Sequence, residues 1–287
     1  MTIDSSPVAL ISIKSFGDFI IARWALRHVA SSPSRVIRLV AGEHLRALST
    51  AMDRDDSIQY VEHGEEFPSL FDAKKRGMLR AALSAVRLRR VIGNLVLPSK
   101  TTLVFDRVGP RERFVAGSFA TTALPVRDNI YLSYCALLDV LPLQDCTTPA
   151  DPSKLAKVGI FPGSRMAAKH LPASIVEALV DVCRRHSLEA QVFVLDGEQE
   201  TLRNASFDFT IVPRTFAAMA DAVRSSTFVV SADSMPAHLA EYFGQPVFVV
   251  SPVDNRYWLP LSCLVSNRWS TFADAGRGCS TFDRFLE

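Results

Sequence analysis

Apolar runs of strand length alternate with amphipathic segments of helix length along nearly the whole chain. This alternation is typical of parallel sheets built from strand–helix–strand units, so the expected fold class is α/β. In the first half, the pattern predicts strands at 8–13, 36–41, 58–61 and 102–105 and helices at 19–29, 43–51 and 131–140. In the second half, it predicts strands at 157–161, 191–195, 209–212, 227–231 and 247–250 and helices at 172–186, 199–204, 216–224 and 234–243.

The rhythm breaks once, between Leu141 and Lys154. This segment holds three prolines among small polar residues and has no apolar periodicity, which indicates a linker. The 287 residues suffice for two domains of about 140 residues each. We therefore expect two Rossmann-like domains, at 1–148 and 149–287, with a substrate cleft between them.

Composition narrows the class of protein. Hydrophobic residues at 48% and charged residues at 22% are the balance of a folded globular protein. No apolar run is long enough to span a membrane, and the first residues lack the features of a secretory signal. The five cysteines form no C-x-x-C pair, which favours buried free thiols in a reducing cytoplasm over a metal site or disulfide framework: Cys135, Cys146, Cys183, Cys263 and Cys279.

Parallel sheets bind ligands outside the carboxyl ends of their strands, so the residues that follow each strand are candidates for a site. The turn Lys14-Ser15-Phe16-Gly17-Asp18 follows the first expected strand. Gly17 allows a tight turn. Asp18 is either the N-cap of the next helix or a general base that projects into the cleft. The turn lacks the G-x-G-x-x-G pattern of a dinucleotide site.

A second turn, Phe161-Pro162-Gly163-Ser164-Arg165, follows the first strand of the second half, and Lys169 comes shortly after it. Gly163 and Ser164 bring backbone N–H groups and a hydroxyl close enough for a phosphate. Lys169 is either a solvated side chain or a cation that neutralises a leaving diphosphate. The segment is not a P-loop.

A third turn opens the expected helix 234–243. Its free N–H groups and positive dipole suit a diphosphate, with Asp233 beside them. His238, one helical turn further, is either part of this pocket or a satisfied core histidine. After strand 191–195, Glu198 and Glu200 are placed to accept ribose hydroxyls, or serve only as helix-start charges.

Together these turns resemble glycosyltransferase family nine, the ADP-heptose:lipopolysaccharide heptosyltransferases, which have the GT-B architecture. The similarity is clearest in residues 8–30 and 157–260. It rests on Ser15-Phe16-Gly17-Asp18, Phe161-Pro162-Gly163-Ser164, Lys169-His170-Leu171-Pro172, Val212-Pro213-Arg214, Asp233-Ser234-Met235-Pro236-Ala237-His238, Gly244-Gln245-Pro246-Val247 and Ser251-Pro252-Val253-Asp254.

The resemblance implies an inverting transferase that moves heptose from ADP-heptose onto a lipopolysaccharide-core or related glycan acceptor, without a metal ion or cofactor. Asp18 would be the general base, and Lys169 would stabilise the leaving diphosphate. The implied donor-binding residues of the C-terminal domain are Gly163, Ser164, Arg165, Glu200 (or Glu198), Pro213, Arg214, Asp233, Ser234, Met235 and His238. The implied acceptor-binding residues of the N-terminal domain are Lys14, Lys74, Lys75 and Arg76.

Two positions differ from the family motifs: Met235 replaces the usual glycine and Leu171 the usual tryptophan. Met235 and the short stretch of chain after Phe285 keep open a different class, a non-catalytic nucleotide-sugar-binding or scaffold protein on the same fold. A nucleotide-sugar epimerase is a third possibility.

Seven basic residues and no acidic ones lie between Lys74 and Arg90, interspersed with apolar residues. The spacing predicts a basic amphipathic helix, with either a solvated face or a surface for anionic lipid or a phosphorylated acceptor. We therefore expect a cytoplasmic protein with peripheral contact to the inner face of the cytoplasmic membrane through residues 74–90. A net charge of +2 and a basic segment without interleaved aromatics argue against nucleic acid.

Overall fold

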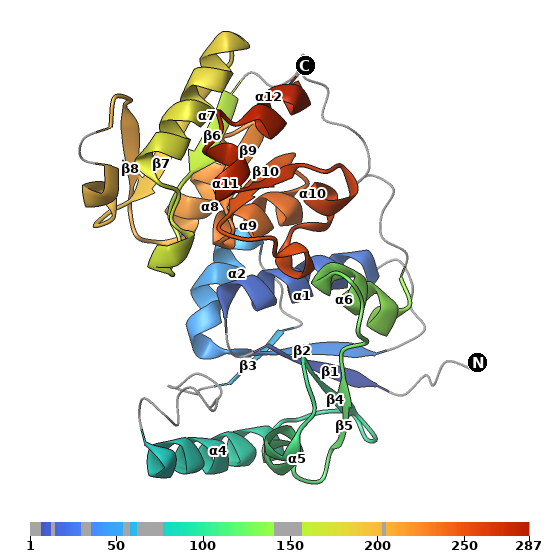
Figure 1. Cartoon of the computed structure of the whole chain (residues 1–287). Coiled ribbons are helices and arrows are strands. Elements are labelled where there is room, and N and C mark those ends of the chain that lie inside the picture. The colour runs from blue at the N-terminus through green and yellow to red at the C-terminus, as the bar shows by residue number, and fades with distance from the viewer. Residues whose placement is uncertain are drawn as a thin grey trace. The chain divides into compact units, whose positions relative to one another are not determined.

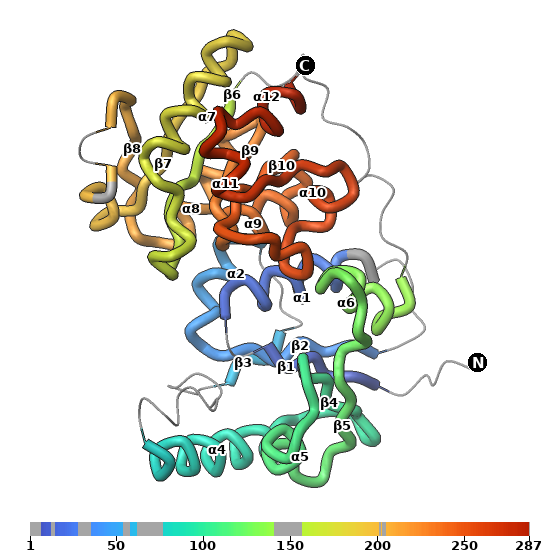
Figure 2. Tube along the Cα trace, in the orientation of Figure 1, coloured from blue at the N-terminus to red at the C-terminus, as the bar shows by residue number. Residues whose placement is uncertain are grey.

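The structure, a computed structural model, describes residues 7–12, 15–29, 36–53, 58–61, 77–140, 157–202 and 205–286 (Figures 1 and 2). Contacts divide the chain into two compact units. The first unit comprises the residues up to Val126 together with Ala136–Val140, and the second comprises Arg127–Cys135 together with the residues from Leu141 onward. The expected linker, 141–154, and the expected boundary after residue 148 lie outside the described residues.

The first unit is built on a parallel sheet of strand order β3-β2-β1-β4-β5. Its strands are β1 (Val8–Ser12), β2 (Ile37–Gly42), β3 (Ile58–Val61), β4 (Thr102–Phe105) and β5 (Ala120–Ala123). The chain starts in the middle of the sheet, winds outward to β3 and then returns to the other side of β1. The direction of winding therefore reverses between β1 and β4, which is a topological switch point.

Helices cover both faces of this sheet (Figure 1). They are α1 (Phe16–Val29), the 3₁₀ turn η1 (Glu43–Leu45), α2 (Arg46–Met52), α4 (Met78–Gly93) and α5 (Pro110–Ala116). Side chains alternate along a strand, so Ala9 of β1 and Leu103 of β4 face α4 and α5, where they pack with Leu88 and Ile92 of α4. Figure 1 shows α1 and α2 on the opposite face.

The second unit repeats this plan with the order β8-β7-β6-β9-β10-β11, again parallel throughout. Its strands are β6 (Lys157–Phe161), β7 (Glu189–Leu195), β8 (Phe209–Val212), β9 (Phe228–Ala232), β10 (Val247–Ser251) and β11 (Trp269–Thr271). Its helices are η4 (Ala167–Lys169), α7 (Ala173–Arg185), η5 (Gln199–Leu202), α8 (Phe216–Arg224), α9 (Met235–Phe243), η6 (Arg256–Trp258), α10 (Leu261–Val265), α11 (Phe272–Ala275) and α12 (Ser280–Leu286). The switch point lies between β6 and β9.

Burial explains why these segments form a stable core. Every residue of β9 is buried, as a central strand covered on both faces requires. On one face, α7 buries an apolar stripe at helical spacing, and Phe282 of α12 stacks on Phe228 of β9 with ring centroids 6.1 Å apart. The ends of the helices are set by local contacts. The Thr215 hydroxyl accepts the Ala218 N–H at 3.2 Å to start α8, and Gly244 ends α9 at φ 73°.

The α/β fold class with parallel sheets is confirmed. Four strands lie where the sequence predicts them: 58–61, 102–105, 157–161 and 209–212. The expected start of the first helix at residue 19 is wrong, because α1 begins at Phe16, and α7 begins at Ala173 with Pro172 as its N-cap. Short elements without a clear pattern were missed, namely β5, β11, α5, α10, α11 and α12.

Helix α6 (Ile130–Leu138) lies at the junction of the chain between the units: its residues up to Cys135 group with the second unit and the rest with the first. The described cysteines, Cys135, Cys183, Cys263 and Cys279, are free and buried, and Cys146 lies outside the described residues. Among the residues that the structure describes, no helix is both long and apolar enough to cross a membrane.

Candidate functional site

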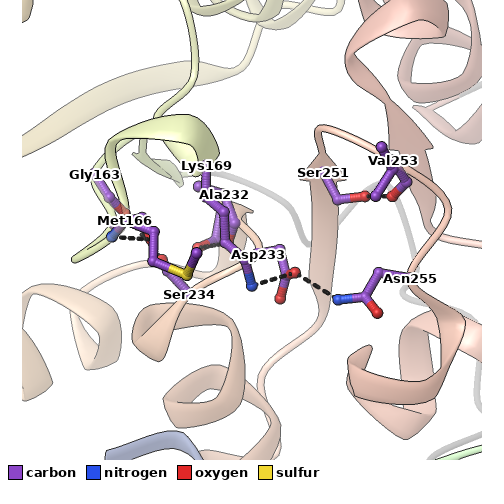
Figure 3. Close-up of polar contacts among 11 residues, drawn as sticks. Gly163, Met166, Lys169, Ala232, Asp233, Ser234, Ser251, Val253 and Asn255 are labelled. Atoms are coloured by element: carbon purple, nitrogen blue, oxygen red, sulfur yellow. Dashed lines mark hydrogen bonds and ion pairs between the residues drawn. The ribbon is translucent and has the colours of Figure 1, made fainter. Parts of the chain in front are cut away.

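The switch point of the second unit gathers polar side chains from three loops (Figure 3). The loops follow β6, β9 and β10, which are neighbours in the sheet. The loop after β6 is closed by a bond of 2.9 Å from the Leu171 N–H to the Pro162 carbonyl. In open parallel sheets the ligand crevice lies at this point.

Lys169, Asp233 and Asn255 form the centre of this site. The Lys169 Nζ lies 2.8 Å from Asp233 Oδ2, and the Asn255 amide donates to the same oxygen at 3.0 Å. The Asp233 side chain is 6% exposed, whereas the Lys169 side chain is 26% exposed. Because the carboxylate is buried and the Lys169 side chain is partly exposed, Lys169 is a positioned cation, and an ammonium group has more N–H groups than this one contact uses.

A second contact joins the loops after β9 and β6. The Ser234 hydroxyl donates to the Gly163 carbonyl at 2.9 Å, and consequently it does not cap the N–H groups at the start of α9. Those N–H groups and the helix dipole make the start of α9 electropositive. Asp233, the partner of Lys169, comes two residues before α9, whose first residue is the half-buried Met235.

The remaining residues of the loop after β6 have local partners. The Ser164 hydroxyl accepts the Met166 N–H at 3.3 Å, and the Ser164 carbonyl contacts the His170 ring. Arg165 is exposed. The Ser164 side chain thus shapes its own turn, and the carbonyl and hydroxyl are both engaged within the loop.

His238 lies behind this cluster in the protein interior. Its Nδ1 is 2.9 Å from the hydroxyl of Tyr131, which is fully buried and comes from α6. Burial lowers the pKa of His238 to about 4, with smaller and opposing influences from Asp233, which raises it, and Lys169, which lowers it. His238 is therefore a neutral, hydrogen-bonded core histidine at neutral pH.

A further set of contacts ties the start of α6 to the loop after β10. The Asn129 amide donates to the Arg256 carbonyl at 3.0 Å and to the Leu259 carbonyl at 2.9 Å. Sequence reasoning missed Asn129, Tyr131 and Asn255. Only Asn255 carried a usable signal, because it follows a strand that neighbours β9 at the carboxyl edge of the sheet.

The loops after β7 and β8 are joined by Glu198 and Arg214. Arg214 Nη2 lies 3.2 Å from Glu198 Oε1, and Arg214 Nε donates to the Asp196 carbonyl at 3.1 Å. A Cβ on Gly163 would meet Glu198 Oε2 at 2.4 Å, so the carboxylate of Glu198 lies directly over the β6 loop. Glu200 is exposed on η5, and Pro213 is exposed on the loop after β8. Of the two glutamates, Glu198 is thus the one that reaches the loop after β6.

In the first unit, the turn after β1 places Asp18 in the first turn of α1. The Ser15 hydroxyl accepts the Asp18 N–H at 3.3 Å, so Ser15 is the N-cap and the N-cap interpretation of Asp18 is wrong. Asp18 is half-buried at the switch-point edge of this sheet. Phe16 lies near His44, which follows β2, with ring centroids 6.2 Å apart. Lys14, Lys74, Lys75 and Arg76 lie outside the described residues.

No protein-family model matches the sequence, and no curated protein matches it. Solved structures do match. A family 9 glycosyl transferase from Veillonella parvula has a TM-score of 0.61 at 13% identity over 91% of this chain and 86% of that chain. The chain has the fold of a glycosyltransferase.

Two further solved structures agree. The E. coli ADP-heptose lps heptosyltransferase II has a TM-score of 0.60 at 16% identity, and the match covers 98% of this chain and 98% of that chain. The E. coli heptosyltransferase WaaC with ADP-2-deoxy-2-fluoro heptose has a TM-score of 0.59 at 11% identity over 97% of this chain and 99% of that chain. The expected GT-B fold is thereby confirmed.

Proposed function

We propose that this protein is an inverting, metal-independent glycosyltransferase that moves heptose from ADP-heptose onto a lipopolysaccharide-core or related glycan acceptor. The observation that carries the proposal is the Lys169–Asp233–Asn255 cluster at the switch point of a unit with the fold of known heptosyltransferases. In this assignment the first unit binds the acceptor and the second unit binds the donor.

The donor diphosphate binds between the loop after β6 and the start of α9. Lys169 and the N–H groups of α9 supply positive potential from two sides, while Gly163 lets the backbone come close. Asp233 and Asn255 hold Lys169 in place, because Asp233 is buried and accepts from both. Ser164, Arg165, Ser234 and Met235 complete the donor pocket, and the buried His238 supports it from behind.

The nucleoside binds over the loops after β7 and β8. We assign ribose to Glu198 rather than Glu200, because the Glu198 carboxylate lies over Gly163 whereas Glu200 is exposed. A carboxylate at this position accepts both ribose hydroxyls. Pro213 and Arg214 flank the base, and Arg214 orients Glu198 through their ion pair of 3.2 Å.

Asp18 acts as the general base of the transfer. It removes the proton of the acceptor hydroxyl as the hydroxyl oxygen attacks the anomeric carbon from the face opposite the leaving group. The bond from that carbon to the diphosphate oxygen breaks, and its electron pair stays on the diphosphate. Lys169 and the N-terminus of α9 stabilise that charge where it develops. A single displacement of this kind inverts the anomeric centre.

The acceptor is an anionic glycolipid or glycan that reaches the first unit at the inner face of the cytoplasmic membrane. Lys14, Lys74, Lys75 and Arg76 are the proposed acceptor-binding residues, because their charge matches phosphorylated sugars.

A thermal-shift panel with ADP, UDP, GDP and CDP tests the donor site. Ligand at a hundred times its Kd stabilises the folded state by about 2.7 kcal/mol, so a selective rise in Tm with ADP is expected. Lys169→Met should weaken ADP binding roughly tenfold to a hundredfold, because a charge-assisted hydrogen bond is lost. Lys157→Met is the matched control, since Lys157 lies at the amino end of β6, whereas the site lies at the carboxyl ends of the strands. A preference for another nucleotide would discard ADP-heptose but keep the transferase class.

Asp18→Asn distinguishes the transferase from a non-catalytic nucleotide-sugar-binding protein on the same fold. The enzyme should lose transfer from ADP-heptose and keep its ADP-dependent rise in Tm, because Asp18 belongs to the other unit from Lys169. Unchanged transfer would remove Asp18 from the mechanism. Conversion of free donor without acceptor, seen by product analysis, would favour an epimerase.

A further inference from the structure

Helix α4 has two apolar faces, and only one of them packs on the protein. Ser84, Leu88 and Ile92 recur at four-residue spacing and are buried against the sheet of the first unit. Since an α-helix turns 100° per residue, the opposite face carries Leu79, Leu83 and Val86. These three side chains therefore point away from the core.

The outward face is exposed to a degree that is unusual for such side chains. Leu79 is 75% exposed, Leu83 52% and Val86 43%. Single exposed apolar residues are common, but a contiguous row along one helix marks an interaction surface. We call these three residues the α4 apolar stripe.

Arginines border the α4 apolar stripe, and α4 contains no acidic residue. Arg80 and Arg87 are exposed along one flank of the stripe. Arg90 is exposed on the same face as the stripe, nearer the end of the helix. Arg89, on the other flank, is held by the neighbouring α5: it donates to the Phe114 carbonyl at 2.7 Å, and its guanidinium lies 4.9 Å from the Phe114 ring centroid. Phe114 is itself 43% exposed, so it extends the apolar surface onto α5.

We propose that the α4 apolar stripe and its bordering arginines dock this protein onto a bilayer that contains anionic phospholipid. A helix with a low overall hydrophobicity, an apolar row and flanking arginines is built to lie in the membrane interface. The leucines enter the boundary between head groups and acyl chains, while Arg80, Arg87 and Arg90 contact lipid phosphates. The proposal deepens the proposed function and rests on it in one respect, namely that a lipid-linked acceptor is presented at this surface.

The charge pattern favours a lipid surface over a second copy of the chain. Pairing two α4 helices through their stripes would bring the arginines of both copies together without any acidic partner on either helix. An anionic bilayer neutralises the same arginines.

Sedimentation with vesicles tests the proposal on the full chain. The wild-type protein should bind phosphatidylglycerol-containing vesicles at low ionic strength, and at least about tenfold less at about 0.5 M salt or on pure phosphatidylcholine. The Leu79→Ser/Leu83→Ser variant should bind at least about tenfold more weakly, because two apolar anchors leave the interface. The Arg80→Gln/Arg87→Gln variant should lose roughly thirtyfold on the anionic vesicles.

The matched control is Ile211→Ser/Val265→Ser, which removes two side chains of similar exposure, 49% and 53%, from the second unit. It should bind vesicles as the wild type does. Absence of wild-type binding, or an equal loss in the control and the leucine variant, would overturn the proposal. A wild-type dimer that becomes monomeric in the leucine variant would instead make a second copy the occupant.

The thermal shift with ADP distinguishes failure of the membrane-docking proposal from failure of the proposed donor site. The leucine and arginine variants should retain the wild-type rise in Tm with ADP, because they leave the second unit untouched. Lost vesicle binding with an intact ADP response concerns the membrane surface alone. Intact vesicle binding without any nucleotide response would refute the donor site and leave the docking surface standing.

Discussion

The buried pair of His238 and Tyr131 should make the stability of this protein depend on pH. Burial lowers the pKa of His238 from 6.5 to about 4 in the folded state. Between pH 6.5 and pH 4, His238 of the unfolded chain therefore binds a proton that His238 of the folded chain does not. Stability from this group is fully present above pH 6.5 and is lost as the pH falls toward 4.

The size of the effect follows from the same two pKa values. One pKa unit corresponds to about 1.4 kcal/mol, so the full loss is about 3 kcal/mol, of which about 2 kcal/mol has gone by pH 5. Glu241 is buried as well, and burial raises its pKa, so its contribution has the opposite sign and is lost as the pH rises. A comparison with a variant that lacks only the imidazole cancels Glu241 and every other shared group.

The assay is urea unfolding of the wild type and His238→Gln, followed by circular dichroism at several pH values from 7.5 to 5. Gln cannot titrate but keeps a polar end for Tyr131. The wild type should be the more stable protein at pH 7.5, and its advantage should shrink by about 2 kcal/mol at pH 5. An advantage that stays constant over this range would refute the reasoning, because it would mean that His238 titrates alike in both states.

Two further substitutions test neighbouring contacts. Tyr131→Phe should destabilise the protein by about 1–3 kcal/mol at neutral pH, because Nδ1 of the buried His238 loses its partner; urea unfolding measures this, and a change below about 0.5 kcal/mol would contradict it. Gly163→Ala should displace the Glu198 carboxylate, which a new Cβ would approach to 2.4 Å. Stability should fall by less than about 1 kcal/mol, since the Glu198 ion pair with Arg214 is partly exposed, while ADP affinity in calorimetry should drop by tenfold or more. Unchanged affinity would remove Glu198 from the ribose site.

The positions of the polar turns were predictable because strand ends can be recognised from local pattern. The turn after β6, with Gly163 and Lys169, and the turn after β9, with Asp233, were both identified in this way. The contact between these two turns was not predictable from the sequence. Lys169 and Asp233 are 64 residues apart, and they meet because β9 pairs with β6 after two intervening strands. Strand order depends on how the helices cross the sheet, and no local pattern records it.

Other features depended on tertiary contacts from the start. Tyr131 lay in a predicted helix, yet nothing in that helix marks it as the partner of a histidine 107 residues away. Only packing decided that partner. Asp18 is a different case, because the Ser15 hydroxyl that accepts its N–H is three residues away, so the N-cap is a local feature that the sequence interpretation assigned to the wrong residue.

Helix α4 shows most clearly which features follow from the sequence and which depend on the tertiary structure. Its periodicity and its arginines are properties of the sequence alone, as are the α/β class and the turns that bear the site. The sequence also holds two apolar rows on this helix, one through Leu88 and one through Leu83, and hydrophobicity does not rank them. The tertiary structure decided that Leu88 is buried and Leu83 exposed, because burial is settled by shape complementarity across elements distant in the chain.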